Sequence, residues 1–308
     1  MENQDIKVTV RCITYNQKDY IRQCLDGFVM QRTNFRFEAI VHDDASTDGT
    51  DEIVREYAEK YPDIIKPIFE TENQYSKHDG SLGRIMNANT RGKYVAICEG
   101  DDYWTDPLKL QKQADFLDAN PQCSLTYHAC KNVFSTQCKV KILYGESVKK
   151  SYSDIDIISL YPFQTATVMY KKEILDSDLY KKAQAIGCTA GDQILFLTAS
   201  RLGTIEGVNE QMSVYRRHEG GISQHMHDAD KLWKNFKDWQ KVAMLFGGEI
   251  SSLIKKNQLS EYILFAFCDK KYLLFLRLEA LSLIKSPISL VQSLKTILRF
   301  NYNRFFKK

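Results

Sequence analysis

The sequence predicts an α/β protein whose parallel sheet is covered by helices on both faces, and three observations lead to this class. Short apolar runs of strand length alternate with segments whose apolar residues recur at helical spacing. Acidic residues directly follow two of these runs, at the strand ends where a parallel sheet gathers its ligands. With 308 residues, the chain is also long enough to bury a core of that size.

The alternation is clearest in the first third of the chain. Strands are predicted at 7–13, 37–42, 64–70 and 94–98, and amphipathic helices at 20–29, 53–61 and 83–90. Between the second strand and its helix, Asp48 and Gly49 supply the N-cap chemistry and the turn glycine that a helix start requires. This order predicts parallel pairing of the four strands.

The rest of the chain is less regular, above all between residues 131 and 159. The pattern predicts a helix around Leu110 and Leu117, strands at 124–128 and 168–171, a helix at 192–201, and a strand pair from 203–207 to 214–217. From His227 onward the spacing is helical. We therefore expect a first domain over 1–225 and a helical extension over 226–308.

Composition and cysteine spacing disfavour several classes of protein. No uncharged run approaches the length of about 20 residues that a spanning helix needs. The N-terminus has no basic segment followed by an apolar one, so no secretory signal is predicted. The eight cysteines contain no C-x-x-C pair, which disfavours a zinc ribbon and favours a reduced cytosolic protein.

Charge is unevenly distributed, although the whole chain carries only +3. From Ser251 onward, eleven Lys and Arg stand against three Asp and Glu, interleaved with apolar residues such as Phe265 and Leu283. Such segments are typical of amphipathic helices on the anionic inner leaflet of a membrane. Closure of the domain core or pairing with a second copy is the open alternative. Nucleic acid is a poorer partner, because no recognition module accompanies the charge.

Glu99, Asp101 and Asp102 follow the apolar strand at 94–98 at once. Packed together, such carboxylates raise one another's pKa unless a cation or hydrogen-bond donors compensate them. Their oxygens suit Mg²⁺ or Mn²⁺, and Mg²⁺ typically combines one or two protein carboxylates with phosphates of the substrate. The cluster predicts a phosphate-bearing ligand, with a solvated acidic turn as the alternative.

Three motifs at these strand ends together resemble the bacterial branch of the family 2 inverting glycosyltransferases. They are Thr-Tyr-Asn at 14–16, Asp-Asp-Ala-Ser-Thr-Asp-Gly-Thr at 43–50 and Glu-Gly-Asp-Asp-Tyr-Trp at 99–104. The likeness extends over roughly residues 7–220, where Tyr-Arg-Arg-His at 215–218 resembles a feature near the end of the family's domain. Ile13, Ala45 and Glu99 depart from the pattern, which often has Pro, Gly and Asp there.

The resemblance implies the GT-A fold, a Rossmann-like, mixed and mainly parallel sheet with a nucleotide-binding half over 1–105 and an acceptor half over 106–225. It implies a metal-dependent, inverting, hexosyltransferase-type enzyme. Such an enzyme takes a sugar from a nucleotide-diphosphate donor and passes it to a glycan or polyprenyl-linked acceptor in bacterial surface polysaccharide synthesis. A cytoplasmic protein, peripheral on the inner face of the cytoplasmic membrane, fits that role.

The resemblance also assigns residues. The residues implied to bind the donor are Thr14, Tyr15, Asn16, Asp43, Asp44, Arg84 and Asp101. The residues implied to bind Mn²⁺ or Mg²⁺ are Glu99, Asp101, Asp102 and His218. Inversion in one displacement needs a single base for the acceptor proton, and Asp192 stands at the position where the family carries it. The alternative for Asp192 is a helix N-cap.

Three other readings compete. A sugar nucleotidyltransferase needs a glycine-rich, basic phosphate loop near the first strand, and residues 14–18 do not supply one. A non-catalytic nucleotide or carbohydrate binder is disfavoured by the intact set of Asp101, Asp102 and Asp192. Residues 44–49 echo a calcium loop, but the twelfth position is Arg55 instead of the bidentate Glu, which rejects an EF-hand.

Overall fold

The computed structural model describes residues 5–134, 140–141, 151–160, 162–187, 191–218 and 229–255. The chain forms two compact units, Met1–Glu219 and Gly220–Lys308. The boundary expected after residue 225 lies outside the described residues and stays a prediction, as does the helical character of 256–308. In the second unit, α9 (Ala229–Phe246) is described. Within the described ranges, no helix is both long and apolar enough to cross a membrane.

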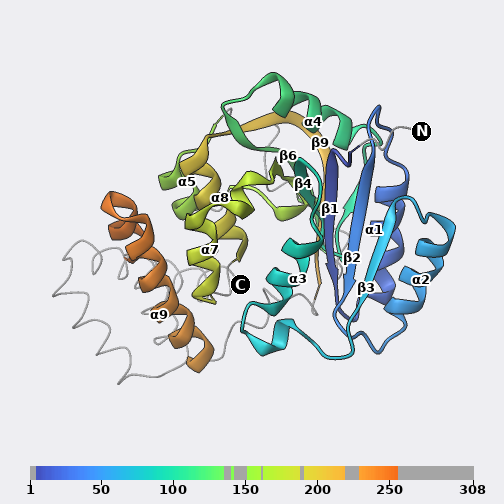
Figure 1. Ribbon diagram of the computed structural model, residues 1–308, viewed down its shortest axis with the longest axis horizontal. Helices are drawn as coiled ribbons and strands as arrows, with labels where there is room; N and C mark the ends of the chain where they lie inside the picture. Colours follow the sequence, from blue (N-terminus) through green and yellow to red (C-terminus); the bar gives the residue numbers. More distant parts are fainter. Residues whose placement is uncertain are drawn as a thin grey trace, which may run out of the picture. The chain divides into compact units, whose positions relative to one another are not determined.

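A mixed sheet organises the first unit (Figure 1), with strand order β3–β2–β1–β4–β8–β6–β9–β5 and β7 (Val140–Lys141) beside β6. Parallel ladders join β1 (Val8–Thr14) to β2 (Phe37–Asp43) and β4 (Tyr94–Ile97), and β2 to β3 (Ile65–Phe69). β8 (Met169–Lys171) runs antiparallel to β4 and to β6 (Cys123–Phe134). β9 (Thr204–Arg217) runs parallel to β6 and antiparallel to β5 (Tyr103–Trp104).

Helices cover both faces of the parallel part. α1 (Lys18–Val29) and α2 (Thr50–Lys60) lie together on one face, and α3 (Ser81–Asn89) lies on the other (Figure 1). This follows from the right-handed crossover rule, because the chain steps outward from β1 to β3 and then returns across the sheet to β4. The direction therefore reverses between β1 and β4, the position at which open α/β sheets bind ligands.

The remaining helices surround the second half of the sheet. They are α4 (Lys109–Ala119), α5 (Asp154–Leu160), α6 (Glu173–Asp176), α7 (Asp178–Ala185) and α8 (Gly191–Leu202), with short 3-10 turns η1 (Tyr75–Lys77) and η2 (Thr165–Thr167). Strands from both predicted halves, 1–105 and 106–225, join the same sheet.

The core fixes β1 and its neighbours in place. On α1, Ile21, Cys24, Leu25 and Phe28 recur at helical spacing and are fully buried. Each such side chain contributes about 1.5–3 kcal/mol through removal of apolar surface from water. Cys12, Cys24 and Cys98 are buried free thiols and act as small apolar residues of this core.

The predicted elements of the first third are confirmed, with ends shifted by up to three residues. The strand pair predicted from 203–207 to 214–217 is wrong, because β9 is one continuous strand. Its middle is polar and exposed, which is typical of a turn, but pairing with β6 keeps it extended, and the surplus residues are absorbed at register shifts near Ala129. For the same reason β6 continues to Phe134, beyond the predicted end at 128.

Candidate functional site

The candidate site lies where β1, β2 and β4 end, at the reversal of strand order. The chain leaves β4 through the acidic bend, which we define as residues 99–102. Gly100 fastens this bend to the end of β1, because its N–H donates to the Ile13 carbonyl at 3.0 Å. A Cβ atom on Gly100 would lie 2.7 Å from Thr14 Oγ1 and 2.4 Å from Gln17 Oε1. The close approach of bend and strand therefore requires glycine.

We expect Gly100→Ala to destabilise the protein by about 1–3 kcal/mol, the usual cost of overpacking a filled site. Urea unfolding followed by far-UV circular dichroism measures this loss. Gly191→Ala is the control, because a Cβ atom there meets nothing within 4 Å. A Gly100→Ala protein as stable as the wild type would contradict the packing described above.

The three acids of the bend have different surroundings. Glu99 accepts a hydrogen bond from Thr165 Oγ1 at 2.6 Å, and burial, reinforced by the charges of Asp101 and Asp192, raises the pKa of Glu99 to about 7. Asp102 is 1 % exposed, and burial together with repulsion from Asp101 and Glu99 raises the pKa of Asp102 well above its ordinary value. If all three acids were ionised, the bend would carry more negative charge than its surroundings compensate, and a bound cation would favour that ionised state.

The end of β9 closes over the bend. The Arg216 backbone N–H donates to Asp102 Oδ1 at 2.9 Å, and the Arg216 guanidinium donates to the Asp101 carbonyl at 2.5 Å. The same guanidinium lies over the rings of Tyr103 and Tyr20, at 4.3 Å and 5.3 Å from their centroids. Arg216 therefore fixes the backbone of the bend, a role that the sequence analysis missed although the residue lies inside the Tyr-Arg-Arg-His motif.

His218 meets Asp101 at this place. Its Nε2 lies 3.0 Å from Asp101 Oδ2, and the side chains are 9 % and 20 % exposed. The His218 ring packs against Tyr20, with centroids 4.6 Å apart. These two predicted metal ligands, which lie far apart in the sequence, are thus neighbours that a solvent-borne ion can reach.

A divalent cation fits this pair. Asp101 and His218 offer one carboxylate and one imidazole, and small cations commonly combine so few protein ligands with phosphate oxygens of the substrate. In the part of the chain that the structure describes, no three His, Cys, Asp or Glu side chains are grouped to hold an ion by themselves. Asp102 is engaged with the Arg216 backbone and Glu99 with Thr165. The four-residue metal set stays a prediction.

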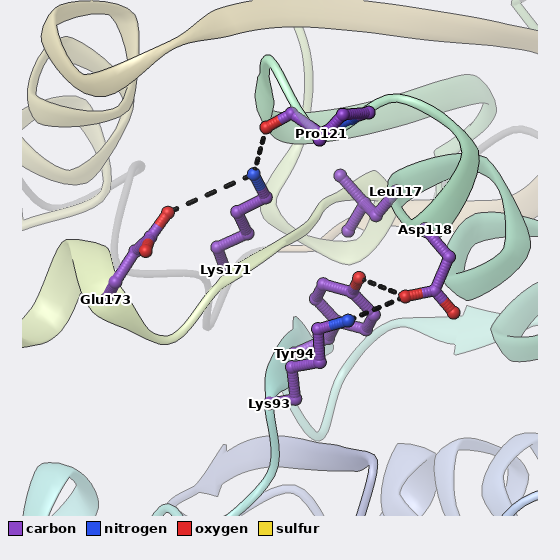
Figure 2. A pocket seen from close by; sticks show the side chains of 7 residues that line it. All are labelled: Lys93, Tyr94, Leu117, Asp118, Pro121, Lys171 and Glu173. Atoms are coloured by element: carbon purple, nitrogen blue, oxygen red, sulfur yellow. Dashed lines mark hydrogen bonds and ion pairs between the residues drawn. The ribbon is translucent and has the colours of Figure 1, made fainter.

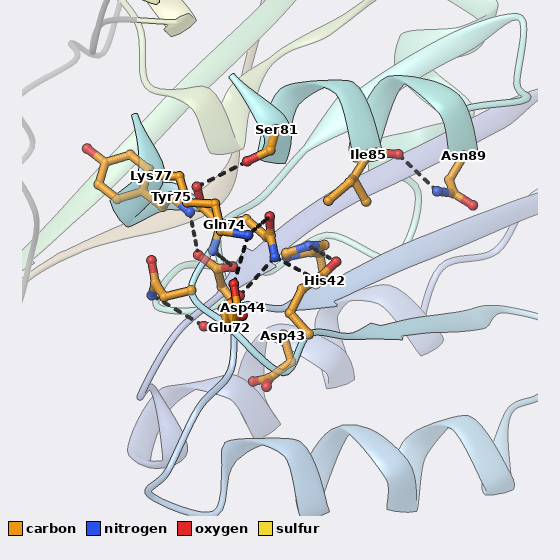
Figure 3. Close-up of polar contacts among 12 residues, drawn as sticks. His42, Asp43, Asp44, Glu72, Gln74, Tyr75, Lys77, Ser81, Ile85 and Asn89 are labelled. Atoms are coloured by element: carbon orange, nitrogen blue, oxygen red, sulfur yellow. Dashed lines mark hydrogen bonds and ion pairs between the residues drawn. The ribbon is translucent and has the colours of Figure 1, made fainter. Parts of the chain in front are cut away.

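Asp44 anchors the segment that follows β3 (Figure 3). Its two carboxylate oxygens accept the backbone N–H groups of Gln74 and Tyr75, at 2.7 Å and 3.0 Å. The neighbouring Asp43 accepts the Ser46 N–H at 3.0 Å through Oδ2, whereas its buried Oδ1 has no hydrogen-bond partner among the described residues. Burial raises the pKa of Asp43. Asp43 Oδ1 is thus the carboxylate oxygen of this pair that lacks a hydrogen-bond partner among the described residues.

The segment after β1 is tied to the segment after β2. Asn16, with φ of 51°, accepts the Thr47 N–H at 2.8 Å through Oδ1 and donates its own N–H to Ser46 Oγ. Thr14 is buried and donates to Gln17 Oε1 at 2.8 Å. Tyr15 projects with 47 % of its surface exposed, which leaves its ring available to a planar ligand.

Arg84 lies on α3, with its side chain 65 % exposed. It donates to the Asp79 carbonyl at 2.7 Å, which keeps the guanidinium on the segment before α3. One turn further on, Asn87 accepts from Arg11 at 2.9 Å and donates to Gln184 Oε1 at 3.1 Å. The structure thus places Arg84 on the helix that begins directly after the segment held by Asp44.

Asp192 lies in the first turn of α8, where its Oδ1 accepts the Gln193 N–H at 2.7 Å. Its charge raises the pKa of Glu99 and that of Tyr75, although burial is the larger cause for both groups. Asp192 therefore lies near both the acidic bend and the segment held by Asp44. α8 already begins at Gly191, so Asp192 is the second residue of the helix.

A cavity of about 350 Å³ lies elsewhere (Figure 2), lined by Lys93, Tyr94, Leu117, Asp118, Pro121, Lys171 and Glu173. Tyr94 begins β4, whereas the acidic bend follows the last residue of β4. The cavity therefore lies at the opposite end of this strand from the acidic bend. Its charged groups pair with one another, since Asp118 Oδ1 accepts from both Lys93 and Tyr94. This cavity therefore does not compete with the acidic bend as the candidate site.

Fold and site together define a protein of the GT-A glycosyltransferase class. The chain belongs to glycosyl transferase family 2, whose sequence model matches residues 9–178. The predicted family and fold are thereby confirmed.

Relatives in several bacteria support this assignment. An uncharacterized protein of Mycobacterium tuberculosis H37Rv is 36 % identical over 228 residues, which cover 74 % of this chain and 64 % of that protein. The chain thus spans less than two thirds of the length of this mycobacterial relative. A putative teichuronic acid biosynthesis glycosyltransferase of Bacillus subtilis is 34 % identical over 119 residues, 38 % of this chain and 44 % of the relative.

Solved structures share the fold at low identity. Staphylococcus aureus TarS, residues 1–349 in complex with UDP-GlcNAc, matches with a TM-score of 0.60 and 20 % identity over 85 % of this chain and 73 % of that 1–349 chain. A mannosyltransferase of Pyrobaculum calidifontis, in complex with GDP-Man and Mn²⁺, matches with a TM-score of 0.53 and 18 % identity over 99 % of this chain and 89 % of that one.

Proposed function

We propose that this protein is a metal-dependent inverting glycosyltransferase, which moves a hexosyl group from a nucleotide-diphosphate sugar to a glycan or polyprenyl-linked glycan. The observation that carries the proposal is the meeting of Asp101 and His218, 3.0 Å apart, beside the charge-rich acidic bend at the reversal of strand order. Asp192, whose charge acts on Glu99, completes the set.

The residues divide the chemistry between them. Asp101 and His218 would hold Mn²⁺ or Mg²⁺, which when bound neutralises the negative charge developing on the departing diphosphate. Asp43 and Tyr15 would bind the nucleoside, through the unpartnered Asp43 Oδ1 acceptor and by stacking on the exposed Tyr15 ring. Arg84 lies on α3, the helix that follows the segment held by Asp44, and would meet the donor's negative charge.

Asp192 is the base of the proposed displacement. The acceptor oxygen forms a bond to the anomeric carbon while the bond from that carbon to the diphosphate oxygen breaks on the opposite side. The acceptor proton passes to a carboxylate oxygen of Asp192, and the electron pair of the broken bond leaves with the diphosphate. One displacement inverts the anomeric centre, so a second protein nucleophile is unnecessary.

The relatives support a role in surface polysaccharide synthesis. The Bacillus subtilis relative is named for teichuronic acid biosynthesis, and TarS was solved with UDP-GlcNAc. We propose that this chain acts on the cytoplasmic side of the membrane, where its basic C-terminal residues would meet the anionic leaflet that carries a polyprenyl-linked acceptor.

Thermal unfolding with a panel of UDP-, GDP- and TDP-sugars, each with Mn²⁺ or with EDTA, tests the proposal. We expect one donor to raise the melting temperature only when Mn²⁺ is present. Saturation at about 100 times Kd adds about 2.7 kcal/mol, a shift of several degrees. The donor so found should release its nucleoside diphosphate when a glycan acceptor is added. A flat response to every donor in the presence of Mn²⁺ would argue against the function.

A further inference from the structure

Lys109, the first residue of α4, is a buried amine that the proposed reaction does not use. Its side chain is fully buried, and within the described residues its Nζ has no hydrogen-bond partner. The Nζ atom lies over the Trp104 ring, 3.8 Å from the ring centroid. Burial lowers the pKa of Lys109 to about 7. An amine held in the core at such a cost needs a compensating contact.

Other unpaired polar atoms lie in the same seam between α4 and β6. Gln113, one helical turn after Lys109, donates to the Thr167 carbonyl at 2.9 Å and approaches the Thr126 carbonyl at 3.5 Å. Gln113 Oε1, Thr126 Oγ1 and His128 Nε2 are buried without partners among the described residues. Since Thr126 and His128 are two apart on β6, and Gln113 and Lys109 are four apart on α4, Lys109 is placed toward His128.

The chemistry of His128 makes it an acceptor. Its Nδ1 lies 2.9 Å from the Ala129 carbonyl oxygen, which can only accept, so Nδ1 carries the proton and donates. Burial, and then the charge of Lys109, lower the pKa of His128 to about 3, so the ring is neutral. Its Nε2 therefore presents a lone pair, while the Lys109 amine has N–H groups to donate in either protonation state.

Trp104 connects Lys109 to the acidic bend. Its indole Nε1 donates to the Ala166 carbonyl at 2.9 Å, and the preceding residue, Thr165, holds Glu99. Its ring packs edge-on against Phe28 with centroids 4.9 Å apart. The Trp104 backbone also lies so close to α1 that a Cβ atom on Gly27 would be 3.0 Å from the Trp104 nitrogen. A displacement of Trp104 would therefore move Glu99, because Trp104 and Glu99 both bond to η2. It would also move the acidic bend, because the Trp104 backbone follows the bend in the chain.

We propose that Lys109 and His128 form a donor–acceptor pair in the α4–β6 seam, bridged by ordered water, and that this pair positions Trp104 and with it the acidic bend. Lys109 is thus a positioning residue. A buried polar pair of this kind is stabilising only when both members are satisfied, because removal of one leaves the other unpaired. The inference rests on the proposed transfer reaction for its effect on metal use, whereas the pair itself does not depend on that function.

A double-mutant cycle tests the pair without any activity measurement. Lys109→Met, His128→Phe and the double variant are compared with the wild type by urea unfolding of the full chain. We expect each single change to raise the unfolding equilibrium constant. In the double variant, this constant should be at least tenfold smaller than the product of the two single effects predicts, which corresponds to a coupling of about 1.4 kcal/mol. Coupling below twofold overturns the pair. If Lys109→Met does not fold, Lys109→Gln replaces it in the same cycle.

The positioning role is tested by metal use. We expect Lys109→Met to raise the Mn²⁺ concentration for half-maximal donor turnover five- to tenfold, with kcat at saturating Mn²⁺ within twofold of the wild type. Lys112→Met is the matched control, because Lys112 lies on the same helix but pairs with Asp106 at the surface. A lower kcat with unchanged Mn²⁺ dependence would mean loss of folded enzyme only, and would overturn the role.

One further readout separates this inference from the proposed function. With 5-fluorotryptophan incorporated, the ¹⁹F resonance that Trp104→Phe removes should move in Lys109→Met and stay in place in Lys112→Met. An unmoved resonance overturns the link from Lys109 to Trp104. If the wild type shows no transfer with any donor, the proposed function fails, while the unfolding cycle and the ¹⁹F shift still decide whether the pair exists.

Discussion

Asp101→Asn is expected to lower metal-dependent transfer by about 10²–10³-fold, since the change removes the charge of the carboxylate that lies at His218 and keeps its shape. The loss should appear both in kcat and in Mn²⁺ affinity, because the carboxylate oxygens of Asp101 would hold the ion and the ion would neutralise the departing diphosphate. Steady-state release of nucleoside diphosphate over a Mn²⁺ titration measures both quantities.

Two controls make the Asp101 result specific. Asp19→Asn removes a carboxylate from the exposed first turn of α1 and should leave the rate unchanged. Unfolding in urea should give Asp101→Asn at least wild-type stability, because the acids of the bend repel one another. Turnover near that of the wild type, at ordinary Mn²⁺ concentrations, would show that Asp101 does not hold the ion.

Asp192→Asn is expected to lower kcat by about 10²–10⁴-fold, the usual contribution of a general base, while donor binding stays within twofold. Asparagine keeps the side-chain oxygen that accepts the Gln193 N–H but cannot take the acceptor proton. Calorimetric titration of the donor with Mn²⁺ measures binding, and single-turnover transfer to the acceptor measures the chemical step.

Asp178→Asn is the matched control for Asp192, because Asp178 is an acid in the first turn of the neighbouring helix α7. If Asp192 served only its helix terminus, both changes would cost about 0.3–1 kcal/mol of stability and spare turnover. Wild-type kcat in Asp192→Asn would thus assign Asp192 to the helix and require another base.

The sequence predicted the frame of the site well. The strands that end at Thr14, Asp43 and Ile97 follow from short apolar runs and the turns after them, and a parallel sheet brings the carboxyl ends of such strands together. The acidic bend was recognisable because three acids follow a buried strand. Lys109 shows where such reading fails, since a lysine at the start of a helix is ordinarily solvated, and only packing of α4 on β6 buries it.

Local periodicity and short motifs indicate the family, the order of strands and helices in the first third of the chain, and the carboxylates offered at the strand ends, so the amino-acid sequence is enough to predict these features. Tertiary packing is what brings His218 to Asp101 across 117 residues, Arg216 to the acidic bend, and Asp44 to the segment after β3. These contacts join segments distant in the chain, and their geometry depends on sheet order and register, which no local pattern encodes.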